Sequence, residues 1–147
     1  MIHEEICTYE VAKLAKEKGF NEECRDFYCN DKRQKRITRT SCNRQVTSFD
    51  YCSNSTLEDY DSPKEYFHIA APTQSLLQRW LREEKGVTIC VDIFDDGWFF
   101  DISTFYKQDT GIYEVDIPYK SSNVSPVYDT YELALEDALK YALENLV

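Results

Sequence analysis

APTQSLLQRWLREEKG, residues 71–86, runs directly into VTICVDIFDDGWFFDISTF, residues 87–105, and this change of pattern decides the fold. Thr73, after Pro72, is a good N-cap, so the sequence predicts a helix that begins there. Gly86 supplies a C-terminal stop for that helix. Apolar residues recur at helical spacing between these two signals: Leu76, Leu77, Trp80 and Leu81.

Three strands are predicted after Gly86. Apolar and other residues alternate from Val87 to Phe94 and again from Trp98 to Phe105, and Asp95-Asp96-Gly97 between them has type I′ turn chemistry. A third strand follows a turn near Gln108–Gly111 and closes at Pro118. It is predicted to place Tyr113, Val115 and Ile117 inward, with Glu114 and Asp116 outward. Short turns between neighbouring strands indicate an antiparallel meander.

Helices are also predicted near both ends of the chain. Thr8 caps the first, which ends at Gly19 with Phe20 folding back in a Schellman-type stop. Thr130 caps the last, from Tyr131 to about Leu146. Its apolar stripe is Ala134, Leu135, Ala138, Leu139, Ala142 and Leu146.

The middle of the chain, residues 21–65, has the weakest pattern. Short strands are predicted at Asp26–Cys29, Arg36–Thr40, Gln45–Tyr51 and Glu65–Ala70, with a turn at Asn30-Asp31 and a loop over Ser53–Pro63. The segment 21–65 is expected to be an irregular, Cys-rich, basic insertion, in part disordered until it binds something.

The predicted architecture is therefore a single α+β domain over residues 1–147. Its sheet is an antiparallel meander of three to five strands, and three helices pack mainly on one face, over the Val87 and Trp98 rows. A chain of this length buries a core without disulfide staples.

Composition limits the class of protein. The chain has 17 basic and 27 acidic residues, a net charge of −10. Residues 73–147 carry 6 basic and 14 acidic residues, so this half repels nucleic acid and anionic membranes. Apolar runs fall short of the roughly 20 residues that cross a bilayer. The acidic N-terminus lacks a signal-peptide h-region, and the expected location is the cytoplasm.

Six cysteines are present, and in the cytoplasm free thiols are expected. Four of them, Cys24, Cys29, Cys42 and Cys52, have the right chemistry for zinc, but the paired spacing of zinc knuckles is missing. A nucleophilic cysteine needs a base, and of the two histidines His68 is the better placed, in a predicted strand.

A carboxylate cluster is the other candidate for chemistry. Asp92, Asp101, Glu114 and Asp116 fall on the predicted outer face of the meander, where they would bind a divalent metal or simply keep the sheet soluble. Glycine occurs only at positions 19, 86, 97 and 111, which excludes the common phosphate-binding loops. We predict no catalytic residue, no cofactor and no metal ligand.

A basic run goes against the acidic trend. It comprises Lys32, Arg33, Lys35, Arg36, Arg39 and Arg44. Aromatic residues flank it at Phe27, Tyr28, Phe49 and Tyr51, so the run is a candidate to follow a phosphate backbone while the rings stack on bases. The alternative is that these cations pair with acidic groups of the same chain.

Three stretches resemble a known group of proteins. They are LAKEKGF at residues 14–20, APTQSLLQRWLRE at residues 71–83 and YELALEDALKYAL at residues 131–143. Together they resemble a family of small uncharacterised proteins of Bacteroidetes genomes and their prophages. The resemblance implies a cytoplasmic protein of mobile-element origin and brings no catalytic residues; the Cys-rich middle departs from the family pattern.

The order helix, three strands, helix is also similar in topology to the double-stranded-RNA-binding domain, which has lysines at the start of its last helix. Acidic residues stand there in this chain: Asp129, Glu132, Glu136 and Asp137. The function predicted first is therefore a non-enzymatic accessory protein that binds another protein through exposed Phe94, Phe99 and Phe105. A homodimer is compatible with this prediction, and nucleic-acid binding through residues 32–44 is the alternative.

Overall fold

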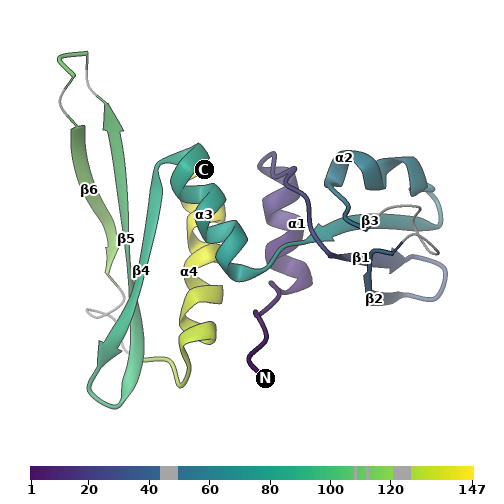
Figure 1. The fold of residues 1–147 in the computed structure, drawn as a ribbon, viewed down its shortest axis with the longest axis horizontal. Coiled ribbons are helices and arrows are strands. Elements are labelled where there is room, and N and C mark those ends of the chain that lie inside the picture. Colours follow the sequence, from purple (N-terminus) through teal and green to yellow (C-terminus); the bar gives the residue numbers. More distant parts are fainter. Residues whose placement is uncertain (44–49, 108, 112, 121–126) are drawn as a thin grey trace. The chain divides into compact units, whose positions relative to one another are not determined.

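The computed structural model describes residues 1–43, 50–107, 109–111, 113–120 and 127–147, and it divides into two compact units. The N-terminal unit is Ile6–Thr73, and the C-terminal unit is Gln74–Val147 together with Met1–Glu5. Each unit has its own antiparallel sheet of three strands (Figure 1).

The N-terminal unit is built around the central strand of its sheet. In chain order its elements are α1 (Tyr9–Glu17), β1 (Asp26–Asp31), β2 (Arg36–Ser41), α2 (Asn54–Leu57), the 3₁₀ turn η1 (Glu58–Tyr60) and β3 (Tyr66–Ala71). The strand order is β2-β1-β3, so β1 pairs on both sides and β2 and β3 are edges. The strand predicted at Glu65–Ala70 is confirmed, since β3 covers nearly the same residues.

Helix α1 begins and ends as its sequence predicts. The Thr8 hydroxyl accepts the backbone N–H of Val11 at the N-terminus. At the other end Gly19 has φ +94°, the Phe20 N–H donates to the Ala15 carbonyl, and the Gly19 N–H donates to that of Lys16. These two bonds form a Schellman motif, and Phe20 is buried beneath it.

The turn between β1 and β2 lies further along the chain than predicted. Asp31 still pairs with Arg36, so the loop is Lys32–Lys35 rather than Asn30-Asp31. The Asp31 carboxylate accepts the backbone N–H groups of Arg33 and Gln34, and Lys35 has φ +51°. An Asx-type turn therefore starts at Asp31, and the basic residues form the hairpin tip.

The predicted loop over Ser53–Pro63 is wrong, because the segment contains α2 and η1. Ser53 caps α2 through a capping box with Thr56. Asn54, the first residue of α2, is only 4% exposed. Its amide donates to the Phe20 carbonyl at 2.7 Å and accepts the Ala70 N–H at 2.9 Å. One side chain therefore joins the end of α1, the start of α2 and the edge of β3.

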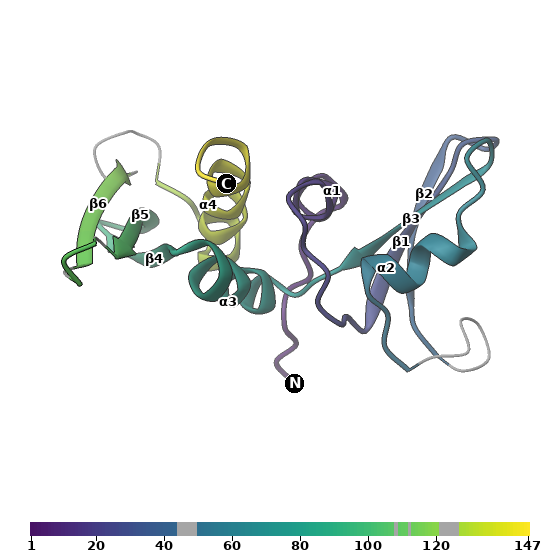
Figure 2. The ribbon, with the colours of Figure 1, turned by 90° about the horizontal axis from the view of Figure 1, so that it is seen from above.

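The C-terminal unit confirms the predicted meander. Its elements are α3 (Gln74–Lys85), β4 (Val87–Phe94), β5 (Gly97–Lys107), β6 (Tyr113–Lys120) and α4 (Tyr131–Asn145), with strand order β4-β5-β6. Helices α3 and α4 lie on one side of this sheet (Figure 2). The opposite side is called here the outer face.

The core of the C-terminal unit lies between the sheet and these two helices. Val87 and Ile89 of β4 and Phe100 and Ile102 of β5 are buried there. Facing them from α4 are Ala134, Leu135, Ala138, Leu139, Ala142 and Leu143, so Leu143 replaces the predicted Leu146. Near the start of β5, the Trp98 ring packs edge to face on the Tyr131 ring of α4, with the ring centroids 5.5 Å apart.

Two further details of this unit are the buried amide of Gln74 and the close packing at Gly97. Gln74 is buried, and its amide donates to the Glu132 carbonyl at 3.0 Å and to the Glu136 carboxylate at 2.7 Å, which ties α3 to α4. The hairpin between β4 and β5 has Asp95 at φ +53°, and Gly97 begins β5. A Cβ at Gly97 would come within 2.6 Å of the Val127 side chain, so glycine is needed there for close approach.

The fold class is thus α+β with antiparallel sheets, as predicted, but the single sheet with three helices is wrong. There are two sheets, and α1 and α2 belong to the N-terminal unit. The segment 21–65 has more regular structure than expected, since β1, β2, α2 and η1 all lie in it. Most of the predicted strand Gln45–Tyr51 lies outside the described residues. Cooperative folding as a single domain stays a prediction.

We predict that Asn54→Ala lowers the free energy of unfolding by about 2–4 kcal/mol, because it leaves the Phe20 carbonyl and the Ala70 N–H buried without partners. The matched control is Asn21→Ala, which removes a bond to the exposed Ser55 N–H and should cost less than about 1 kcal/mol. Urea unfolding followed by circular dichroism measures both. Equal effects of the two substitutions would contradict the anchoring role of Asn54.

Candidate functional site

The outer face of the β4–β6 sheet carries two of the three predicted contact residues. Phe105 is 39% exposed, and Phe99 is half-buried on the same face of β5. Residues opposite each other in an antiparallel pair share a face, and Phe99 pairs with Asp92. The side chain of Phe94 lies outside the described part of the structure.

The predicted carboxylate cluster is not assembled on this face. Asp92 and Asp101 lie on the outer face, opposite Phe99 and Cys90. A register shift in β5 between Ile102 and Thr104 then changes the pairing with β6. Asp116 pairs with Thr104, which pairs in turn with buried Val87. Asp116 therefore belongs to the opposite row, and Glu114, whose side chain is not described, pairs with Tyr106.

Asp101 has a buried carboxylate oxygen. Its Oδ1 is shielded from solvent and has no hydrogen-bond partner in the described structure. Leaving a carboxylate oxygen buried and unpaired is costly, and the cost falls if a donor or a cation comes close. Because this oxygen is shielded from solvent, it is an unsatisfied buried group of the sheet and not a group that a partner's side chain can reach.

The formal charge is divided unequally between the two units. The C-terminal unit has 6 basic and 16 acidic residues, whereas the N-terminal unit has 11 of each. The whole net charge of −10 therefore belongs to the unit that carries the outer face. Surfaces with such an imbalance attract partners of opposite charge and raise their association rates.

The basic run lies on the β1–β2 hairpin, and several of its cations are already engaged. Lys32 donates to the Pro63 carbonyl at 3.2 Å. Arg33 pairs with Asp31 at 3.7 Å and Glu65 at 3.8 Å, and its guanidinium lies over the Tyr66 ring. These contacts support pairing of the basic run with acidic and aromatic groups of the same chain.

Further along the hairpin, Arg39 pairs with Asp26 at 3.7 Å. Lys35 and Arg36 are exposed and have no ion pair in the described structure. Arg44 lies outside the described residues. The basic run is therefore part paired and part available to a ligand.

The aromatic residues beside the basic run do not form a base-stacking surface in the described structure. Phe27 is buried, and Tyr28 packs edge to face on Tyr9 at 5.7 Å while its hydroxyl donates to the Cys7 carbonyl. Tyr51 lies beneath the Arg25 guanidinium. Phe49 lies outside the described residues. The structure thus offers less support for nucleic-acid binding than the sequence did.

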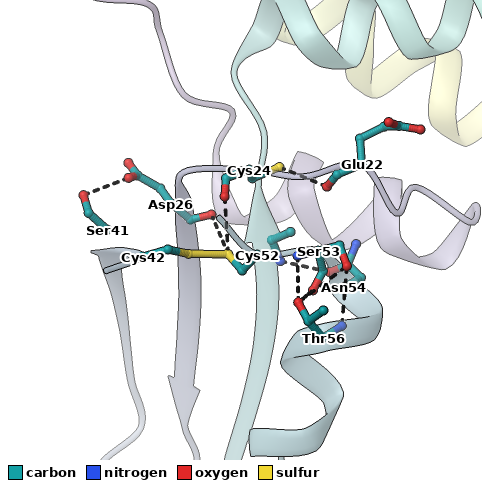
Figure 3. Close-up of a disulfide and its surroundings, with 10 residues drawn as sticks. Glu22, Cys24, Asp26, Ser41, Cys42, Cys52, Ser53, Asn54 and Thr56 are labelled. Carbon is teal, nitrogen blue, oxygen red and sulfur yellow. Dashed lines mark hydrogen bonds between the residues drawn. A yellow bond between two sulfur atoms is a disulfide. The ribbon is translucent and has the colours of Figure 1, made fainter. Parts of the chain in front are cut away.

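The prediction that all the cysteines are free thiols is wrong for two of them. Cys42 and Cys52 form a disulfide, with their Cα atoms 6.5 Å apart (Figure 3). Cys24 lies beside this bond and exchanges two backbone hydrogen bonds with Cys52. The bond joins the end of β2 to the segment before α2. Disulfides persist mainly in oxidising compartments and are uncommon in the cytoplasm. The pair therefore counts against the cytoplasmic location, which stays a prediction.

The four candidate zinc ligands are not brought together as a site. Cys42 and Cys52 are oxidised, and burial raises the pKa of the Cys24 thiol to about 12, helped by Asp26 and Glu22. Cys29 lies within β1. Across the described residues, no group of three or more histidine, cysteine or acidic side chains is arranged to hold a metal ion.

The structure does place His68 beside a cysteine. His68 of β3 pairs with Cys29 of β1, and the Asp61 carboxylate accepts both the His68 backbone N–H and its ring Nδ1–H at 2.7 and 2.8 Å. By residue type, Cys29, His68 and Asp61 match a nucleophile, a base and an acid that orients the base. However, burial, Asp31 and Asp61 raise the pKa of Cys29, which disfavours the reactive thiolate. The group is better explained as support for β3.

Sequence reasoning missed the roles of Asn54 and Asp61 and the pairing of Cys42 with Cys52. The Asn54 signal, a Ser-Asn-Ser-Thr run with capping potential, was present in a segment assigned to a loop. The partners of Asp61 and of the two cysteines are set by strand pairing, which local sequence does not reveal.

Comparisons of the chain with protein-family models, with curated proteins and with solved structures found no match. The resemblance to Bacteroidetes and prophage proteins therefore stays a prediction. Within the described residues, every helix is too short or too polar to cross a bilayer.

We predict a clear order of thiol reactivity in the native protein at pH 8. Cys90 is exposed and should be alkylated first, Cys29 more slowly, and Cys24 only after unfolding, because a raised pKa lowers the thiolate fraction at any pH below it. Cys42 and Cys52 should react only after reduction. Mass spectrometry of timed alkylation measures this order, and labelling of Cys24 as fast as Cys90 would contradict it.

Proposed function

We propose that this protein is a non-enzymatic interaction protein whose outer face, on the β4–β6 sheet, binds a basic surface of another protein. The observation that carries the proposal is how the described residues cover this sheet: α3 and α4 lie on one face, and Phe105 is exposed on the other. Aromatic residues supply much of the binding energy in protein interfaces.

The charge of the C-terminal unit indicates the kind of partner. Its 16 acidic residues outnumber its 6 basic ones, and Asp92 and Asp101 lie on the same face as Phe99 and Phe105. A partner that combines apolar groups with lysine or arginine fits this face better than nucleic acid does.

Chemistry is not part of this proposal. The thiols of Cys24 and Cys29 have raised pKa values, and the predicted carboxylate cluster is split between two rows of the sheet. An origin in a phage or other mobile element is compatible with an interaction protein and remains a prediction from the resemblance alone.

The test is a tagged pull-down from host lysate with two matched variants. Phe105→Ala should remove the specific partner, whereas Leu133→Ala, which truncates a 54% exposed apolar residue on α4, should retain it. Loss of a central aromatic contact typically costs about 2 kcal/mol or more, which lowers affinity roughly thirtyfold. Quantitative mass spectrometry of the retained proteins, with and without nuclease, gives the readout.

The partner should survive nuclease treatment and should dissociate as salt is raised. Retention of nucleic acid, or of proteins that disappear with nuclease, would contradict the proposal and favour residues 32–44 as the binding segment. A partner that both variants lose equally would also contradict it, since Leu133 is not on the outer face.

A further inference from the structure

The hydrogen-bond pattern of the N-terminal sheet shows which backbone groups of β2 point away from β1. The Cys42 N–H donates to the Arg25 carbonyl at 2.6 Å, one step beyond the pair Asp26/Ser41. Hydrogen-bonded pairs alternate along an antiparallel ladder. Arg36, Thr38 and Thr40 therefore bond to β1. The backbone N–H and C=O groups that face outward belong to Ile37, Arg39 and Ser41.

The opposite edge of the same sheet is closed by the protein itself. On β3 the outward residues are Tyr66, His68 and Ala70, because the Lys32 N–H bonds to the Glu65 carbonyl in the same register. Tyr66 exchanges two backbone bonds with Ser62.

The remaining outward N–H groups of β3 are capped by side chains. The His68 N–H donates to Asp61 and the Ala70 N–H to Asn54, while the His68 carbonyl accepts from Lys16 at 3.2 Å. Five backbone groups on this edge thus have partners.

The β2 edge has none of this cover. In the described structure, the outward N–H and C=O groups of Ile37, Arg39 and Ser41 have no hydrogen-bond partner. Those three residues are also exposed, Ile37 at 47%. The strand contains no proline, glycine or bulge, so charged side chains are the one common form of edge protection that it has.

The side chains along β2 are basic. Arg36 is exposed on one face of the strand and Arg39 on the other, and Lys35 precedes them. Ile37 is the exposed apolar residue between the two arginines. The edge strand of the other unit differs: on β4 the Ile89 carbonyl accepts from Gln78 and the Ile93 N–H donates to Asp92.

We propose that the β2 edge binds an extended acidic peptide segment of another protein, which adds as a fourth strand to the sheet β2-β1-β3. Only a strand-like backbone matches a row of donors and acceptors that repeats every second residue, at about 7 Å. Acidic side chains of the segment lie beside Arg36 and Lys35, and apolar ones lie beside Ile37.

A second copy of this chain is a poorer occupant of the same edge. Pairing of β2 with itself brings Lys35, Arg36 and Arg39 of both copies together along one short ladder. Like charges in neighbouring strands destabilise the pairing. The basic edge therefore selects an acidic strand over its own duplicate, and this binding is separate from that of the outer face.

Hydrogen exchange of the protein alone tests the open edge. The amides of Ile37, Arg39 and Ser41 should exchange quickly, while those of Thr38 and Thr40 on the same strand should be protected. On the closed edge, the amides of Tyr66, His68 and Ala70 should be protected although they also face away from β1. Protection of Ile37 and Arg39 equal to that of Thr38 would overturn the proposal.

Binding is tested with a fluorescent synthetic peptide of alternating glutamate and valine, read by anisotropy. Ile37→Pro removes one outward N–H without touching the β1 ladder, and proline is tolerated at such edge positions. It should weaken binding about tenfold, the effect of one hydrogen bond and its neighbours. The matched control, Ile37→Val, keeps the N–H, the β-branched shape and an apolar side chain, and it should bind nearly as the wild type does.

Two further measurements separate the alternatives. Arg36→Glu should weaken the glutamate peptide about fivefold or more, and a lysine–valine peptide should bind the wild type poorly. Binding of both peptides alike, or unchanged binding by Ile37→Pro, would overturn the proposal. Sedimentation that shows a dimer dissociated by Ile37→Pro would also overturn it, because the occupant would then be a second copy. Phe105→Ala should leave peptide binding unchanged.

Discussion

The N-terminal unit depends on one buried amide, that of Asn54. Its two bonds, to the Phe20 carbonyl and the Ala70 N–H, satisfy one group at the end of α1 and one at the edge of β3. Both groups would otherwise be buried or open to another strand. Because an amide both donates and accepts, one side chain joins three elements that are distant in sequence, and no apolar residue of similar size can do so.

This anchor has a consequence for the two edges of the sheet. Asn54, Asp61 and Ser62 all lie in the segment that connects β2 to β3, and all of them cap β3. The described part of the same segment leaves β2 open, with arginines as the strand's main protection against pairing. A charged edge limits association with copies of itself while it still accepts a strand of opposite charge. The asymmetry is thus the structural basis of the selective binding proposed for this edge.

The C-terminal unit shows a comparable asymmetry between faces rather than edges. Small alanines on α4 let the helix approach the sheet closely, so one face forms a dense core. The outer face has Phe99 and Phe105 beside aspartates, in a unit that carries the whole net charge of the chain. The two units therefore present opposite preferences, basic on the β2 edge and acidic on the outer face, which is consistent with an adaptor that contacts two partners.

Local sequence determined α1, α3, α4 and the C-terminal meander. Thr8, Thr130 and Gly19 mark helix ends through contacts within a few residues, and the alternation of residues over Val87–Phe105 indicates the strands directly. Tertiary structure alone decided that β3 pairs with β1, where β5 shifts register against β6, and which cysteines join. It also determined that Asn54 and Asp61 close β3. These features depend on groups brought together from distant parts of the chain, where backbone satisfaction and packing outweigh local preference.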